Sequence, residues 1–132
     1  MSAAYSHPIR VRYGECDMQK VVFNANYLAY CDDAVDSWFR SELTPHGEGF
    51  ETLGFDFMLK TVTLTWHAPL LFGDTAALGC SVARWGNSSF DVAVVGTVGG
   101  EARFEATITY VSVVPDGNTP TRIPDLIRET LG

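Results

Sequence analysis

Residues 24–41, NANYLAYCDDAVDSWFRS, contain the longest helix-like apolar pattern in this chain. Apolar side chains recur in this stretch at intervals of three, four and one residues, which predicts an amphipathic helix over residues 25–41. The apolar stripe consists of Tyr27, Tyr30, Cys31, Ala34, Val35, Trp38 and Phe39. Asn24 or Asn26 is the expected N-cap, because a side-chain oxygen there accepts a hydrogen bond from an N–H of the first turn.

The sequence before the helix predicts a strand followed by an irregular loop. From His7 to Tyr13, apolar residues alternate with arginines, which is typical of a half-buried strand that ends at Gly14. Residues 15–23 have no clean period and are expected to form a loop. The polar residues of this loop are Glu15, Asp17, Gln19 and Lys20.

Helix-breaking residues separate the helix from a run of strands. Residues 42–54 contain a proline and three glycines, which predicts a connection with a helical turn around Gly49–Leu53. Alternating or Val-rich segments then predict strands at Phe55–His67, Thr75–Trp85, Ser88–Val98 and Glu101–Val114. Gly99-Gly100 is a hairpin signal. Pro124, at a first helical turn, predicts a short terminal helix over Asp125–Leu131.

The order of these elements predicts an α+β fold in one domain, residues 1–132. Consecutive strands joined by tight turns pair antiparallel. One helix of about 17 residues, roughly 25 Å long, can cover one face of a five-stranded antiparallel sheet. Long alternating edge strands need covering, and a dimer that extends the sheet would cover them.

Composition excludes several classes of protein. The 132 residues carry a net charge of −7 without a basic run, so nucleic acid is not an expected partner. The three cysteines form no CxxC and no zinc pattern, so we expect free thiols and no metal site. The N-terminus lacks a signal-peptide core, and no apolar run approaches the about 18 residues of a membrane span. We therefore expect a cytoplasmic protein that does not interact with membranes.

Residues 15–34, ECDMQKVVFNANYLAYCDDA, resemble the signature of the 4-hydroxybenzoyl-CoA thioesterase and YbgC-like acyl-CoA thioesterases. In this resemblance Asp17 falls on the family's catalytic aspartate, Phe23 on its aromatic position and Asn26-Tyr27 on its Asn-Tyr pair. Weaker matches follow in the family's order at HAPLLFGDT (67–75), GNSSF (86–90) and RIPDLIRETL (122–131), so that the resemblance covers nearly the whole chain.

The resemblance implies a hotdog fold, in which a five-stranded antiparallel sheet wraps a long central helix. It also implies an acyl-CoA thioesterase that hydrolyses a small aromatic or aliphatic acyl-CoA to the free acid and CoA. CoA is then part of the substrate, and no separate cofactor is expected. Homodimers or homotetramers with sites at the subunit interface are the implied assemblies.

Thioester hydrolysis needs a group that attacks the carbonyl or activates water, and a donor for the developing oxyanion. We expect Asp17 to be the general base or the nucleophile, and N–H groups near Asn24 and Ala25 to polarise the carbonyl. Asn24 is also expected to hold water or the acyl group. The expected substrate-binding residues are Gln19, Val22, Phe23, Ala25, Asn26, Tyr27, Ser88 and Ser89. The expected contacts for the CoA phosphates are Lys60, Arg84 and Arg103, with Lys20 as a further candidate.

The chain departs from the family pattern in two places. Gln19-Lys20 replaces a pair that is often glycine, and Asn24 replaces a His or Tyr, so a histidine contribution to catalysis is absent. Two other roles stay open for the key residues, since Asp17 can be a turn residue and Asn24 a plain N-cap. A non-catalytic hotdog module that binds an acyl or aromatic ligand, or serves in assembly, is the alternative function. A dehydratase is less favoured because its usual histidine is missing.

Overall fold

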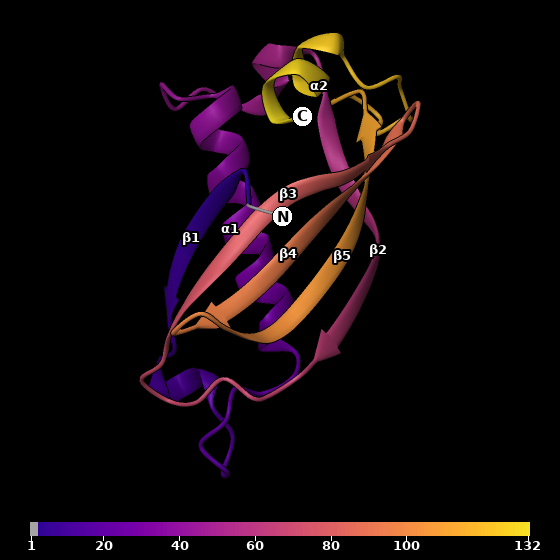
Figure 1. Ribbon diagram of the computed structural model, residues 1–132. Helices are drawn as coiled ribbons and strands as arrows, with labels where there is room; N and C mark the ends of the chain where they lie inside the picture. Colours follow the sequence, from indigo (N-terminus) through magenta and orange to yellow (C-terminus); the bar gives the residue numbers. More distant parts are fainter. Residues whose placement is uncertain (1–2) are drawn as a thin grey trace.

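The computed structural model describes residues 3–132 and contains a long helix, a five-stranded sheet and short helical segments (Figure 1). The helices are α1 (Asn26–Leu43) and α2 (Asp125–Leu131), with 3-10 turns η1 (Tyr13–Glu15) and η2 (Phe50–Leu53). The strands are β1 (Tyr5–Arg10), β2 (Asp56–Trp66), β3 (Thr75–Trp85), β4 (Ser89–Val98) and β5 (Glu101–Val113). The predicted order of elements and the helical turn before β2 are confirmed.

The sheet is antiparallel throughout, with the strand order β1-β3-β4-β5-β2. Tight turns join β3 to β4 and β4 to β5, and these strands pair as expected. Gly99 and Gly100 both have positive φ, at 59° and 83°, which suits the turn between β4 and β5. By contrast, residues 67–74 carry the chain from β2 on one edge to β3 near the other edge, so β2 and β3 do not pair.

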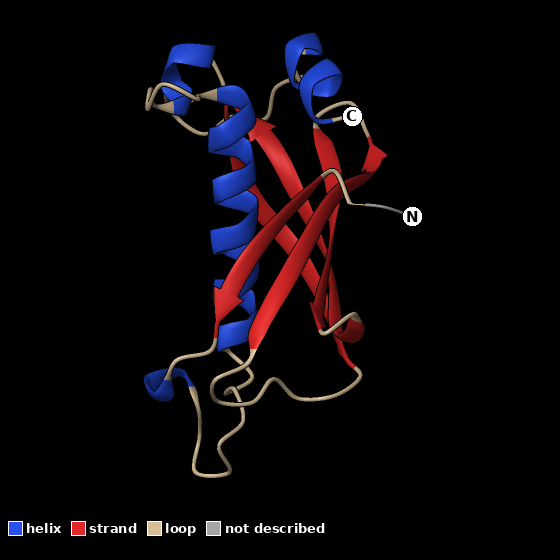
Figure 2. Ribbon diagram, turned by 60° about the vertical axis from the view of Figure 1, so that its left-hand side comes forward, coloured by secondary structure: helices blue, strands red, loops and turns tan. Residues whose placement is uncertain are grey.

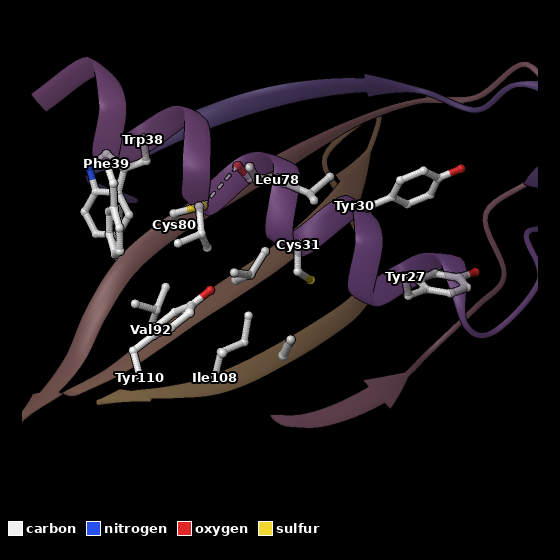
Figure 3. Packing of buried hydrophobic residues seen from close by; sticks show 14 of the residues in the cluster. Tyr27, Tyr30, Cys31, Trp38, Phe39, Leu78, Cys80, Val92, Ile108 and Tyr110 are labelled. Atoms are coloured by element: carbon white, nitrogen blue, oxygen red, sulfur yellow. Dashed lines mark hydrogen bonds between the residues drawn. The ribbon is translucent and has the colours of Figure 1, made fainter. Parts of the chain in front are cut away.

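The predicted apolar stripe of α1 is confirmed in full, because all seven of its residues are buried. The sheet curves around this face of the helix, as the turned view shows (Figure 2). Figure 3 shows stripe residues such as Cys31 and Phe39 directed toward Val92 and Ile108 of the sheet. The helix and the inner face of the sheet therefore share one hydrophobic core.

The structure corrects the sequence-based prediction at both ends of the segment before α1. The first strand ends at Arg10, and Tyr13 is 79% exposed rather than half-buried. The reason is local, since Glu15 accepts the Arg12 N–H through its carboxylate (2.9 Å) and donates its own N–H to the Arg12 carbonyl (3.0 Å), which closes η1. Strand pairing cannot continue through a chain that turns on itself in this way.

The predicted N-caps are also wrong. The N-cap of α1 is Ala25, and no side chain caps the helix there. The Asn26 side-chain amide instead donates a hydrogen bond to the Glu15 carbonyl in the preceding loop. The helix begins one residue later and ends two residues later than predicted, at Asn26 and Leu43.

The two edges of the sheet differ in how they meet solvent. β1 has six residues and includes Pro8, which has no N–H to offer a further strand. β2 has eleven residues, and its exposed apolar side chains include Met58, Leu59 and Trp66 at 49%, 40% and 45% exposure. Among the helices of residues 3–132, none is both long and apolar enough to cross a membrane.

Candidate functional site

Asp17 opens a tight turn in the loop between η1 and α1. Its N–H donates to the Val21 carbonyl (2.9 Å), and its carbonyl accepts the Lys20 N–H (3.0 Å). One carboxylate oxygen, Oδ1, accepts the Gln19 N–H at 2.8 Å. The turn is exposed to solvent and projects beyond the end of the sheet (Figure 1). Asp17 thus has the turn role that the sequence left open, and Oδ2 has no hydrogen-bond partner within residues 3–132.

Glu15 ties this loop to the first turns of α1. Its carbonyl accepts the Phe23 N–H (3.0 Å) and the Asn26 side-chain amide (2.8 Å). Its carboxylate accepts the Tyr30 hydroxyl at 2.8 Å. Burial alone would raise the pKa of Glu15, but the hydrogen bonds from Arg12 and Tyr30 outweigh it and hold the pKa below its usual value. Sequence reasoning did not assign Glu15 a role, although it lies two residues before Asp17 in the same loop.

Backbone donors remain available where the loop enters α1. The Asn26 and Tyr27 N–H groups bond to the carbonyls of Phe23 and Asn24, at 2.9 and 3.3 Å. Within residues 3–132, the N–H groups of Asn24 and Ala25 donate to no protein atom, and both residues are exposed. These donors carry the positive end of the helix dipole and can polarise a carbonyl group.

Asp17 lines a cavity of about 240 Å³ together with Lys20 and Cys16. The remaining walls are aromatic, because Tyr13 and Phe72 pack edge to face with ring centroids 5.9 Å apart. The lining therefore includes an acidic residue, a basic residue and an apolar surface, which suits a small ligand with both polar and apolar parts.

Two of the predicted substrate-binding residues, Val22 and Tyr27, line a different cavity of about 270 Å³ together with Asn24. Its walls come from Val22, Asn24 and Tyr27 on one side and from residues 66–69 on the other. The Tyr27 hydroxyl accepts the Leu70 N–H at 3.0 Å and so fixes the helix start against that segment. Within one chain, Asp17 and Asn24 therefore lie on different cavities. Gln19, Phe23 and Ala25 are exposed on the loop that precedes α1.

Ser88 and Ser89 lie at the opposite end of the sheet from Asp17. Ser89 begins β4, next to the end of β3, whereas the Asp17 loop contacts the chain just before β3. The Val22 N–H, for example, bonds to the Leu70 carbonyl at 2.9 Å. One chain therefore does not bring these serines to the aspartate.

The three cations predicted to contact CoA phosphates are spread over the sheet. Arg84 pairs with Asp91 at 2.9 Å, and this bond holds the pKa of the Asp91 carboxyl below its usual value. Arg103 pairs with Glu101 at 3.0 Å and donates to the Pro69 carbonyl at 2.8 Å. Lys60 is exposed on β2. The structure does not gather these residues into one cluster within the chain.

The chain belongs to the thioesterase-like superfamily, whose family model matches residues 11–131. No curated protein matches it. Among solved structures, it is similar to a thioesterase-superfamily protein from Jannaschia sp. CCS1, with a TM-score of 0.90, 21% identity and coverage of 98% of this chain and 91% of that chain. The hotdog fold implied by the sequence resemblance is thereby confirmed.

Two further solved structures show the same fold. A 1,4-dihydroxy-2-naphthoyl-CoA thioesterase from Synechocystis has a TM-score of 0.81 at 18% identity, covering 96% of this chain and 94% of that chain. A thioesterase from Thermus thermophilus, complexed with coenzyme A and Zn, has a TM-score of 0.83 at 24% identity, covering 98% of this chain and 92% of that chain. In our chain, no group of three or more His, Cys, Asp or Glu side chains within residues 3–132 is placed to bind a metal ion.

Proposed function

We propose that the protein is an acyl-CoA thioesterase that hydrolyses small aromatic or aliphatic acyl-CoA thioesters. The observation that carries this proposal is the loop before α1, which Glu15 holds against the helix by hydrogen bonds to Asn26 and Tyr30. The chain that carries this loop belongs to the thioesterase-like superfamily. This loop carries the Asp17 carboxylate and, where it enters α1, the backbone N–H groups of Asn24 and Ala25, which have no acceptor within residues 3–132. The CoA-bound Thermus relative supports an acyl-CoA ligand.

Hydrolysis can proceed at this loop in either of two ways. As a general base, Asp17 accepts a proton from water while the oxygen of that water bonds to the thioester carbon. As a nucleophile, Asp17 bonds to that carbon itself and forms a mixed anhydride, which water then cleaves. In both cases the C–S bond breaks, CoA leaves as its thiolate, and backbone N–H groups at the helix start stabilise the oxyanion. One such donor is worth about 2.7 to 4 kcal/mol.

We place the complete site at the interface of a homodimer that joins two β2 strands. Two strands related by a two-fold axis run antiparallel, so the Trp66 end of one β2 lies beside the Asp56 end of its partner. In such a dimer, the sheet end of the partner that carries its Ser88 and Arg84 approaches the Asp17 end of the first chain. The exposed apolar edge of β2 supports this arrangement.

Substitution of Asp17 by Asn tests the proposal directly. Asn keeps the side-chain oxygen that accepts the Gln19 N–H, so the turn is preserved while the carboxylate is lost. We expect kcat on a panel of acyl-CoA thioesters to fall by at least about 100-fold. Asp116→Asn, which changes an exposed aspartate in the turn after β5, is the matched control and should retain full activity.

The outcomes separate the candidate functions. A wild-type protein that hydrolyses the panel, combined with an unchanged rate in Asp17→Asn, would exclude Asp17 as the catalyst. A wild-type protein that binds acyl-CoA but turns over no member of the panel would favour the alternative, a hotdog ligand-binding module.

A further inference from the structure

Lys20 stands out among the residues around the Asp17 cavity because of its backbone. Its φ is +64°, in the left-handed region that side chains other than Asn, Asp and Gly rarely adopt. Asn118 is the other described non-glycine residue with positive φ, and asparagine tolerates this conformation. A lysine has no comparable advantage at such a position.

The turn itself does not need the lysine side chain. Lys20 contributes its N–H to the Asp17 carbonyl and its carbonyl to the Phe72 N–H, at 3.0 and 3.2 Å. A glycine would form both hydrogen bonds and would adopt the left-handed backbone without strain. A reason for lysine at this position must therefore lie in what its side chain does.

Lys20 lines the same cavity as Asp17. Within residues 3–132, Lys20 forms no ion pair, in contrast to Arg84 and Arg103, which are both paired with carboxylates. Its ammonium group is therefore available to a ligand. The aromatic walls formed by Tyr13 and Phe72 give such a ligand an apolar surface.

The position of Lys20 indicates which anionic group it meets. The phosphates of CoA are separated from the thioester by the whole pantetheine arm. When the thioester carbonyl is at Asp17, a cation on the same small cavity is therefore too close to the reacting carbon to reach those phosphates. Only a substituent of the acyl group lies within its range. A carboxylate there would also be repelled by Asp17 unless a cation were nearby.

We infer that Lys20 makes this site selective for acyl groups that carry a second carboxylate, so that its substrates are CoA thioesters of short dicarboxylic acids. This inference rests on the proposed thioesterase function and names its substrate class. It assigns Lys20 to the acyl group rather than to the CoA phosphates, and it accounts for the presence of a lysine at a backbone position that favours glycine.

The test compares glutaryl-CoA with pentanoyl-CoA, whose acyl groups have equal numbers of carbon atoms and differ in the terminal carboxylate. We expect wild-type kcat/KM to be about tenfold higher for glutaryl-CoA, after subtraction of the uncatalysed rate. Lys20→Gln and Lys20→Gly should abolish this preference by lowering kcat/KM for glutaryl-CoA alone. Lys20→Gly should unfold at the same temperature as wild type or higher, because glycine suits the backbone. The wild-type preference should also shrink at high salt.

Arg122→Gln is the matched control, because it removes one exposed positive charge next to α2 and should leave the preference unchanged. A preference that persists in both Lys20 variants, or a wild-type protein that favours pentanoyl-CoA, would overturn the inference and leave the thioesterase proposal intact. Absence of turnover on every acyl-CoA would instead overturn the proposed function. The dissociation constants of glutaryl-CoA and pentanoyl-CoA would then test the inference. Equal affinity for the two thioesters would contradict it. Tighter binding of glutaryl-CoA that depends on Lys20 would support it.

Discussion

At the scale of single residues, Glu15 holds the candidate catalytic loop in place. Its backbone carbonyl accepts the Asn26 side-chain amide, and its carboxylate accepts the hydroxyl of Tyr30, one turn further along α1. The exposed Asp17 turn is thus attached to the long helix of the hydrophobic core through a neighbour two residues away. Because Arg12 is 79% exposed, the ion pair between Arg12 and Glu15 contributes little by itself.

The hydrogen bond between Tyr30 and Glu15 should be measurable as stability. Tyr30 is buried and the Glu15 side chain is only 17% exposed. Tyr30→Phe therefore removes one hydrogen-bond donor from a carboxylate that water reaches poorly. We expect a loss of about 1 to 2 kcal/mol in the free energy of unfolding, measured by urea denaturation. Tyr13→Phe removes an exposed hydroxyl and is the control, with no expected loss. Equal effects in the two variants would contradict the role of Glu15.

The lowered pKa of Glu15 predicts how this contribution depends on pH. A carboxyl whose pKa is depressed in the folded state stabilises the fold above its unfolded pKa, near its usual value of 4.5, and loses this effect as pH falls further. Wild type should therefore be more stable than Glu15→Gln near neutral pH. The difference should shrink below about pH 4.5 in urea titrations. A difference that stays constant from neutral to acid pH would contradict this.

At the scale of elements, the contact between β4 and β5 depends on a glycine, Gly96, which has no side chain. Gly96 is buried and lies opposite Phe104 in the strand register. A Cβ built on Gly96 would lie 2.7 Å from the Cδ1 and Cζ atoms of the Phe104 ring, well inside van der Waals contact. The ring occupies the space that any larger residue at Gly96 would need.

Gly96→Ala should therefore destabilise the protein by about 1 to 3 kcal/mol, because the core must move to admit one methyl group. Gly14→Ala is the matched control, since nothing lies within 4 Å of its Cβ position and its φ is not positive. Thermal and urea unfolding of both variants would measure the difference. A neutral Gly96→Ala together with a destabilised Gly14→Ala would contradict the packing seen here.

At the scale of the whole molecule, the uncovered β2 edge predicts the assembly. Leu59 is 40% exposed on this edge, and a charge there should oppose pairing with a second copy. We expect wild type to be a dimer or larger at micromolar concentration by light scattering, and Leu59→Lys to shift it toward monomer with a loss of activity. Leu126→Lys changes a 57% exposed leucine on α2 and is the control. A stable, fully active wild-type monomer would contradict a shared site.

The positions of the helices and strands could be predicted from local sequence patterns. The stripe from Tyr27 to Phe39, the strand from Thr75 to Trp85 and the terminal helix from Asp125 to Leu131 all occur where they were predicted. These predictions succeed because periodicity and turn residues are local properties, set by the pitch of a helix or the pleat of a strand. The motif around Asp17 likewise led to the thioesterase-like superfamily.

The contacts between these elements follow from long-range packing and hydrogen bonds, which local patterns do not predict. β2 lies at the far edge from β1, Asn26 bonds to the Glu15 carbonyl instead of capping its helix, and Asp17 and Asn24 line different cavities. Each result depends on groups distant in sequence, and local pattern does not contain those contacts. The left-handed backbone of Lys20 belongs here too, because the loop is also fixed by Leu70 and Phe72. Sequence placed the aspartate in a loop, and long-range hydrogen bonds determined what surrounds it.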